Sequence, residues 1–176
     1  MREARLGGWG HLAHRLFQVA WARPLSPREQ SEVGALLGPA EARLFWSQPS
    51  ADQRHGLAAA RAVLRQAPGR RDLACAALLH DVGKRRAALG LVGRSLASVI
   101  AKVGLPASGR WRHYLDHPAL GAADLEQAQA QALVIQFACH HHNGRPEGID
   151  ERDWELLQRA DGPSRKTRRL PRHEAQ

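Results

Sequence analysis

Apolar residues recur at helical spacing along most of this chain, and prolines and glycines divide the pattern into short segments. Strand-forming residues are sparse: aromatic residues make up only 5% of the chain, and Ala, Leu, Arg and Gln dominate. Helix-start signals agree, because Ser26-Pro27-Arg28-Glu29 combines a capping box with Pro at the first helical position. The sequence therefore predicts an all-α protein.

Stop signals set the bounds of the expected helices. Pro24, Gly38-Pro39, Pro49 and Pro68-Gly69 each end a periodic segment. We expect helices over Trp9–Ala22, from Ser26 to Gly38, over Ala40–Ser47, Ser50–Gln66, Arg71–His80 and Leu91–Val103, after Pro118, and over Ala130–His140 and Glu151–Ala160.

The length of 176 residues is enough for one domain with a substantial core. We expect a helical extension at 1–49 packed on a central bundle domain at 50–163, followed by a basic, disordered tail at 164–176. Trp9 and Trp21, in the extension, either cover the core or form a dimer face, and a place in the core is the favoured interpretation.

Composition predicts a cytoplasmic protein. Its 43% apolar and 24% charged residues are ordinary for a soluble globular domain. The best candidate for a membrane span, residues 89–105, carries Arg94 and Lys102, and the N-terminal segment lacks the order of a secretion signal. Cys75 and Cys139 lie in apolar helical contexts, which favours buried free thiols in a reducing cytosol.

The formal net charge of +9 is concentrated near the C-terminus, where residues 165–172 include five basic residues in eight. A solvated, disordered terminus is the simpler interpretation, and a nucleic-acid-binding arm is the alternative. No aromatic residues interleave with these charges, so the sequence shows no platform for stacking bases. The mild positive balance elsewhere suits a phosphorylated substrate equally well.

The segment Leu78-Leu79-His80-Asp81-Val82-Gly83-Lys84 follows an apolar run and places an imidazole beside a carboxylate. Such a pair can bind a metal ion, and Lys84, one helical turn after His80, can reach a metal-bound phosphate. In a chain of this composition about 0.5 His-Asp pairs are expected by chance. The meaning of this pair therefore depends on further ligands elsewhere in the chain.

Further candidate ligands lie at the ends or inner faces of successive expected helices, and a helix bundle can focus such side chains on one point. With the pair itself, they are His55, His80, Asp81, His117, the run His140-His141-His142, and Asp161. Taken singly, His55, His117 and Asp161 each have a structural explanation, as a half-exposed histidine, a helix start and a helix end. Three adjacent histidines are costly in a helix and repel when protonated, which favours a ligand role for the run.

Helix geometry limits the histidine run to two ligands. Successive helical residues point about 100° apart, so three in a row span about 200° and cannot all face one site. Val134 and Phe137 define the buried face, and counting forward from them favours His140 and His141. We expect His142 to lie beside the ligands or to face the substrate.

In this order, the residues resemble the HD superfamily of metal-dependent phosphohydrolases. The resemblance rests on the segment from Leu78 to Lys84, on His117-Pro118-Ala119-Leu120-Gly121 and on the paired histidines, and it covers roughly residues 50–162. It implies an HD-domain helical bundle with an N-terminal helical extension. It also implies a two-metal site, in which the first metal is bound by His55, His80, Asp81 and Asp161, and the second by His117, His140 and His141, with Asp81 as the bridge.

The implied activity is hydrolysis of a phosphomonoester, phosphodiester or phosphoanhydride bond in a nucleotide-type substrate, by a metal-activated water. Asp81 and Lys84 would be the catalytic residues, with Lys84 steadying the phosphate. Two adjacent metals lower the pKa of a bridging water and clamp both oxygens of an in-line displacement. Ligation by several imidazoles and two carboxylates suits Fe, Mn or Ni better than Mg.

The chain departs from one branch of the superfamily. The HD-GYP branch follows its paired histidines with Glu and later Gly-Tyr-Pro, whereas this chain reads His142-Asn143-Gly144-Arg145-Pro146-Glu147-Gly148. Ala51 stands where some members carry Glu, so we expect no third metal. The compact size is similar to that of small bacterial HD hydrolases of dinucleoside polyphosphates and nucleotides. The alternatives are a catalytically weak HD domain that binds metal and nucleotide in signalling, and a nucleic-acid-associated protein whose metal site is structural.

Overall fold

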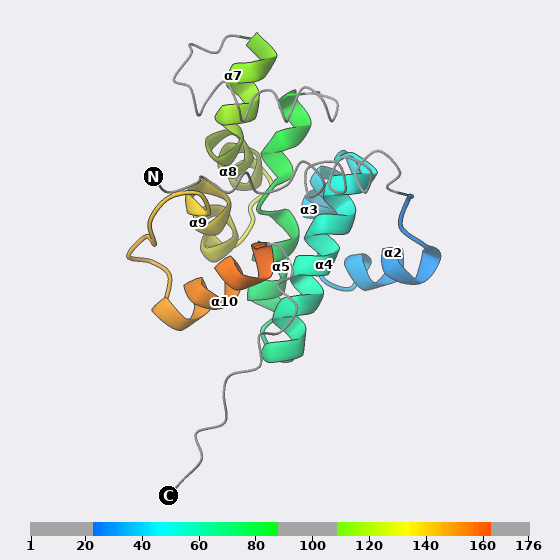
Figure 1. The fold of residues 1–176 in the computed structure, drawn as a ribbon. Coiled ribbons are helices and arrows are strands. Elements are labelled where there is room, and N and C mark those ends of the chain that lie inside the picture. Colours follow the sequence, from blue (N-terminus) through cyan, green and yellow to red (C-terminus); the bar gives the residue numbers. More distant parts are fainter. Residues whose placement is uncertain (1–22, 88–108, 163–176) are drawn as a thin grey trace, which may run out of the picture.

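The computed structural model describes residues 23–87 and 109–162 of the chain (Figure 1). These residues form eight α-helices and one 3-10 helix, and they contain no strand, which confirms the all-α prediction. The elements are α2 (Pro27–Gly34), α3 (Pro39–Trp46), α4 (Ser50–Gln66), α5 (Arg71–Leu79), η1 (Val82–Ala87), α7 (Gly109–Leu115), α8 (His117–Gln127), α9 (Ala132–His140) and α10 (Glu151–Asp161).

Parts of the prediction fall outside the described residues. They are the expected helices over Trp9–Ala22 and Leu91–Val103, both tryptophans of the first of these, and the basic tail. Within the described residues no helix has the length and apolar character that crossing a membrane requires.

The first helices begin where local signals predict. The Ser26 hydroxyl accepts a hydrogen bond from the Glu29 amide at 3.4 Å, and the Glu29 carboxylate accepts one from the Ser26 amide at 2.9 Å. This reciprocal pair is the predicted capping box, and it satisfies amides that have no partner inside the helix. Val33 of α2 and Phe45 of α3 are then buried in the same core as the central helices.

Helices α4 and α5 stand side by side at the centre, with α9 and α10 on one side and α2 and α3 on the other (Figure 1). The close approach of α4 to α5 depends on Gly56, because a Cβ there would lie 2.5 Å from the Leu78 carbonyl oxygen. The core around them is apolar, and its largest fully buried side chains include Phe45, Leu73, Leu78, Leu79, Leu125, Phe137, Ile149 and Leu157.

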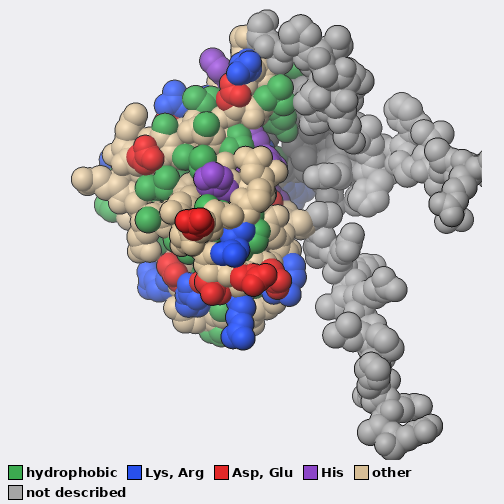
Figure 2. Space-filling view, turned by 90° about the vertical axis from the view of Figure 1, so that its left-hand side faces the viewer, with side chains coloured by type: hydrophobic (Ala, Val, Ile, Leu, Met, Phe, Trp, Pro, Cys, Tyr) green, Lys and Arg blue, Asp and Glu red, His purple; other side chains and the backbone are tan. Residues whose placement is uncertain are grey.

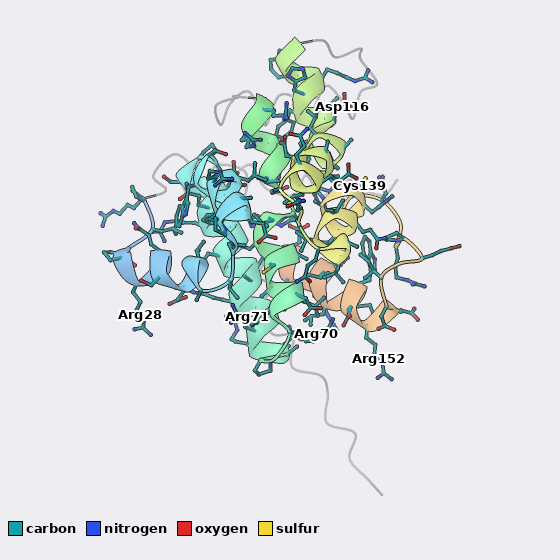
Figure 3. The ribbon with its side chains drawn as sticks, turned by 180° about the vertical axis from the view of Figure 1, so that it is seen from behind. Arg28, Arg70, Arg71, Asp116, Cys139 and Arg152 are labelled. Carbon is teal, nitrogen blue, oxygen red and sulfur yellow. The ribbon has the colours of Figure 1, made fainter. Side chains whose placement is uncertain are left out.

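Ion pairs tie helices together at the surface. Arg70, just before α5, donates to both carboxylate oxygens of Asp153 on α10 at 2.8 and 2.7 Å, and to Asp72 at 2.8 Å (Figure 3). Bidentate geometry of this kind fixes orientation as well as distance. On the face drawn in Figure 2, acidic and basic side chains lie intermixed, so that face has no single sign of charge.

Two elements were not predicted from the sequence, and both lie next to candidate ligands. The 3-10 helix η1 directly follows Asp81, and α7 ends just before His117. Both are short and contain basic residues: Lys84-Arg85-Arg86 in η1, and Arg112-His113 in α7. Their conformation follows from packing, since η1 contacts both α7 and α8.

Candidate metal centre

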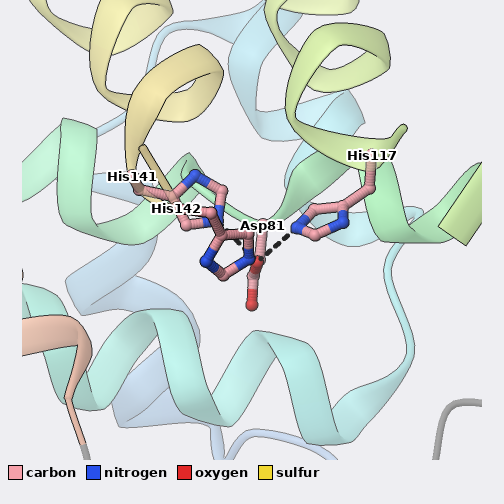
Figure 4. Close-up of side chains that lie close together, drawn as sticks. All are labelled: Asp81, His117, His141 and His142. Carbon is pink, nitrogen blue, oxygen red and sulfur yellow. Dashed lines mark ion pairs between the residues drawn. The ribbon is translucent and has the colours of Figure 1, made fainter. Parts of the chain in front are cut away.

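Seven side chains converge in two groups that could each hold a metal ion. His55, His80 and Asp161 form one, the His55 group, and Asp81, His117, His141 and His142 form the other, the Asp81 group (Figure 4). Within each group, the ligand atoms all lie within 4.8 Å of one another.

Helix ends deliver most of these side chains. His80 caps the C-terminal end of α5, and Asp81 follows it at the start of the turn into η1. His117 is the first residue of α8, and Asp161 is the last residue of α10. His55 is the exception, since it projects from the first half of α4. Because the helices end around one interior point, residues more than 100 positions apart in sequence meet there.

In the His55 group, Asp161 is the shared partner of two imidazoles. Its Oδ1 lies 3.1 Å from Nε2 of His55 and 2.9 Å from Nε2 of His80. The two rings meet edge to face with centroids 5.2 Å apart. His80 is completely buried, whereas His55 is partly open to solvent. The group therefore has a closed interior side and an open side.

Asp81 lies between the two groups and turns one carboxylate oxygen toward each. Its Oδ2 is 3.5 Å from Nε2 of His80 and 4.0 Å from Nε2 of His55. Its Oδ1 is 3.4 Å from Nε2 of His117 and 3.5 Å from Nε2 of His141. Asp81 is 5% exposed, so water does little to screen these interactions. A carboxylate in this position can contribute an oxygen to an ion in each group.

Backbone hydrogen bonds fix the tautomers of three histidines. Nδ1 of His80, His117 and His141 lies 2.9, 2.7 and 2.9 Å from the carbonyl oxygen three residues earlier in the chain. A carbonyl oxygen only accepts, so each Nδ1 carries the proton and each Nε2 presents a lone pair. This is how metal-ligating imidazoles are usually held.

The lone pairs aimed into the site have no hydrogen-bond partner. Among the described residues, five buried side-chain atoms lack one, and four of them belong to the site: Nε2 of His80, His117 and His141, and Oδ1 of Asp81. Buried polar atoms are almost always satisfied, so a cluster of unsatisfied ones requires an explanation. Four electron-pair donors facing a common interior are well suited to a cation.

The carboxylates of the site are held in the charged form. Burial raises the pKa of Asp81, but His80 and Lys84 outweigh this effect and leave the pKa well below its usual value. Burial also raises the pKa of Asp161, but the adjacent imidazoles of His55 and His80 outweigh this effect and leave the pKa lowered. Both carboxylates are therefore ionised at neutral pH, as metal ligation requires.

The histidines of the two groups differ in their affinity for protons. Burial lowers the pKa of His117, and partial burial of the His142 ring, together with the neighbouring His141, lowers the pKa of His142 to about 4. For His80, burial lowers the pKa, but the charges of Asp81 and Asp161 outweigh it and leave the pKa raised. A proton therefore competes with a cation more strongly in the His55 group than at these two histidines of the Asp81 group.

Lys84 brings a positive charge to the edge of the site. Its Nζ donates to Oδ2 of Asp81 at 2.5 Å, and its side chain is 17% exposed. Burial lowers the pKa of Lys84, but the Asp81 carboxylate raises it more, so the amine stays protonated. The backbone prepares this contact, since the Lys84 amide also donates to the Asp81 carbonyl at 3.0 Å in the turn that begins η1.

The structure brings together every predicted ligand except His140, whose place is taken by His142. The expectation for His140 assumed regular helix through the histidine run, but α9 ends at His140. The Asn143 amide then donates to the His140 carbonyl at 2.7 Å, which tightens the chain into a turn. The helical spacing of about 100° per residue therefore does not apply beyond His140, and the ring centroid of His142 lies 5.1 Å from that of His117.

Two residues that touch the site were not predicted from the sequence. The Tyr114 carbonyl accepts the proton of His117 Nδ1, and the Tyr114 and His117 rings lie 5.8 Å apart. The Gln158 side chain donates to the His141 carbonyl at 2.7 Å. The position of Gln158, one helical turn before Asp161, was the one available indication.

Comparison of the chain with protein-family models, with curated proteins and with solved structures finds no match.

Proposed function

We propose that this protein is a metal-dependent phosphohydrolase of the HD type, acting on a nucleotide-type substrate. The observation that carries the proposal is the set of buried, unpartnered Nε2 atoms that surround the two oxygens of Asp81. A helical protein that merely needed a stable core would gain nothing from desolvating these atoms. Cation binding accounts for all of them at once.

The residues present fit two divalent transition-metal ions. The His55 group with Asp81 Oδ2 would hold one ion, and the Asp81 group, with Oδ1, would hold the other. Five imidazoles and two carboxylates suit Fe, Mn or Ni better than Mg, which prefers oxygen ligands and keeps its waters. Two ions so held would supply an activated water and a clamp for a phosphoryl group.

The remaining residues of the site suit a phosphate. Lys84 places a positive charge where negative charge develops on the phosphoryl oxygens, and it is close enough to Asp81 to act beside the ions. His142 is exposed while the other three members of the Asp81 group are buried. A substrate can therefore approach from the side of His142 and put its phosphate next to the buried ligands, in a phosphomonoester, a phosphodiester or a phosphoanhydride.

We place this activity in the cytoplasm. Cys75 and Cys139 are both free and half-buried. Burial raises the pKa of the Cys75 thiol to about 11, so it stays protonated and unreactive, as suits a structural thiol in a reducing compartment.

The experiment is metal analysis of protein purified without chelator, followed by assays with bis(4-nitrophenyl) phosphate, 4-nitrophenyl phosphate and a panel of nucleotides. We expect about two transition-metal ions per chain and metal-dependent release of product. His80→Ala and Asp81→Asn should lose both, whereas His113→Ala, at an exposed histidine outside the two groups, should keep both.

Three outcomes separate the proposal from its alternatives. Full activity in Asp81→Asn would overturn a mechanism centred on this site. Saturable nucleotide binding with bound metal and no product would instead support an HD domain that binds nucleotides in signalling. Retention on nucleic acid that is lost when residues 164–176 are removed, and that falls steeply with salt, would support the nucleic-acid-associated alternative.

A further inference from the structure

One hydrogen bond connects the helix that supplies a ligand to the His55 group with the turn that supplies ligands to the Asp81 group. Gln158 lies on α10, one turn before Asp161, and its Nε2 donates to the His141 carbonyl oxygen at 2.7 Å. Residues three apart on a helix project to the same side. The Gln158 amide and the Asp161 carboxylate therefore leave α10 in the same direction, one toward each group.

The Gln158 side chain hydrogen-bonds to a backbone carbonyl just beyond the end of α9, where no helical amide is available to donate to it. The last carbonyls of a helix have no partner within it, and α9 ends at His140. The Asn143 amide donates to the His140 carbonyl at 2.7 Å, and the Gln158 side chain donates to the next carbonyl, that of His141. The turn that presents His141 and His142 is thus closed by its own backbone on one side and by α10 on the other.

His141 is held by three hydrogen bonds, of which one comes from another helix. Its amide donates to Phe137 and its Nδ1 to Ala138, both at 2.9 Å and both within α9. Those two bonds orient the ring relative to α9. The bond from Gln158 sets the same residue relative to α10, and so relative to Asp161.

We propose that Gln158 is a positioning residue that couples the two metal-binding groups, so that the affinity of the Asp81 group for a divalent cation depends on its hydrogen bond to His141. The inference rests on the metal binding proposed above. It goes beyond that proposal by assigning communication between the groups to one side chain outside both of them.

The fold offers a second link that keeps α10 in place when this bond is removed. Trp154, one turn before Gln158, packs edge to face on Phe137 of α9 with ring centroids 5.6 Å apart. Leu157, next to Gln158, is fully buried in the core. Loss of the Gln158 amide should therefore change the alignment of His141 and leave the packing of the helices intact.

The test is titration of Gln158→Met with Mn²⁺, because methionine has a similar length and no N–H donor. Arg159→Ala is the matched control, since Arg159 is the exposed next residue on α10. Bound Mn²⁺ is measured by calorimetry and by electron paramagnetic resonance, in which two neighbouring ions give a spin-coupled signal. We expect two ions in wild-type and Arg159→Ala protein. In Gln158→Met the ion in the His55 group should bind as in wild type and the ion in the Asp81 group 10- to 100-fold more weakly, about the usual effect of removing a group that supports a ligand.

The outcomes are distinguishable. Wild-type protein that binds two ions, with a Gln158→Met variant that titrates identically, overturns the inference and leaves the proposed function intact. An equal loss at both groups, with reduced helix content by circular dichroism, also overturns it, because Gln158 would then support the fold as a whole. Wild-type protein that binds no Mn²⁺ overturns the metal binding on which both rest.

Discussion

Gly83 lies against the backbone of His117 so closely that a Cβ on Gly83 would be 2.0 Å from the His117 carbonyl oxygen. The same Cβ would lie 2.6 Å from the Gly121 amide nitrogen. No side chain is involved on the far side, so a rotamer change cannot relieve either contact. The glycine two residues after Asp81 thus allows α8 to start beside η1, which brings His117 to 3.4 Å from Asp81.

We expect Gly83→Ala to move the start of α8 and separate His117 from Asp81. Forcing a methyl group into a packed backbone contact costs about 2 kcal/mol of folding free energy, and more where the backbone must shift. Mn²⁺ titration should show a weakened Asp81 group, and urea denaturation a lower midpoint. Gly144→Ala is the control, since a Cβ at Gly144 meets nothing within 4 Å. Equal behaviour of the two variants would contradict this account.

Lys84 should be needed for hydrolysis but not for metal binding. In Lys84→Met the apolar stem remains, while the ammonium that contacts Asp81 Oδ2 is gone. Mn²⁺ affinity should be equal or higher because a competing positive charge has been removed, whereas kcat should fall about 100-fold through loss of charge stabilisation at the phosphate. Arg65→Met, at an exposed basic position, serves as the control. Loss of metal in Lys84→Met would show that Lys84 organises the ligands instead.

Acid should release metal from the His55 group before the Asp81 group. The pKa of His80 is raised, whereas the pKa of His117 is lowered and that of His142 is lowered to about 4. As pH falls from alkaline values to the usual histidine pKa of about 6.5, a proton therefore competes for His80 Nε2 while His117 and His142 remain neutral. Mn²⁺ titrations across this range should show the spin-coupled signal giving way to one ion in the Asp81 group. Release in the reverse order would contradict the prediction.

A buried carboxylate outside the site should contribute to stability. Asp124 on α8 is 3% exposed, and its Oδ2 lies 2.8 Å from Nη2 of Arg85 and 3.0 Å from Nε of Arg86. Burial raises its pKa, but the two arginines outweigh burial and leave the pKa lowered. A lowered folded-state pKa gives stability that is present above the unfolded value of about 3.9 and is lost as pH falls through the folded value.

Asp124→Asn should therefore unfold more easily at neutral pH, by roughly 2 kcal/mol, the usual worth of hydrogen bonds to a charged group. The difference from wild type should shrink as pH is lowered below about 4, because the wild-type carboxylate then gains a proton as well. Urea denaturation at several pH values measures both effects. A difference that is constant with pH would mean that shape, and not charge, explains the cost.

Local signals in the sequence were sufficient to predict most of the helices in the described residues. Ser26 and Glu29 specify the start of α2 by themselves, and α4 spans Ser50–Gln66 as predicted. Neither η1 nor α7 was predicted, because each is short and the two contact each other although they lie far apart in the chain. Apolar periodicity is a local property of the sequence. It does not predict a short element whose conformation depends on tertiary contacts.

The candidate site was predictable in the residue types and their order, but not in the detail of the histidine run. Helix ends bring His80, Asp81, His117 and Asp161 together, and a sequence that places ligands at successive helix ends already indicates a common point. Which histidine faces Asp81 depends on where α9 stops and how the following turn closes. That ending involves a backbone bond to Asn143 and a side chain from α10, neither of which is visible in the run itself.

Two single variants distinguish the observed pair of ligands, His141 and His142, from the pair predicted by helical spacing, His140 and His141. His142→Ala should weaken cation binding in the Asp81 group about tenfold or more, since the imidazole of His142 is one of its four donors. His140→Ala should bind Mn²⁺ as wild type does, because His140 belongs to neither group. Both residues lie at the same helix end, so any general effect on α9 should appear in both melting curves. If His140→Ala loses the ion of the Asp81 group while His142→Ala keeps it, the observed arrangement is wrong. The helix would then continue through the histidine run in solution, as the spacing from Val134 and Phe137 predicts.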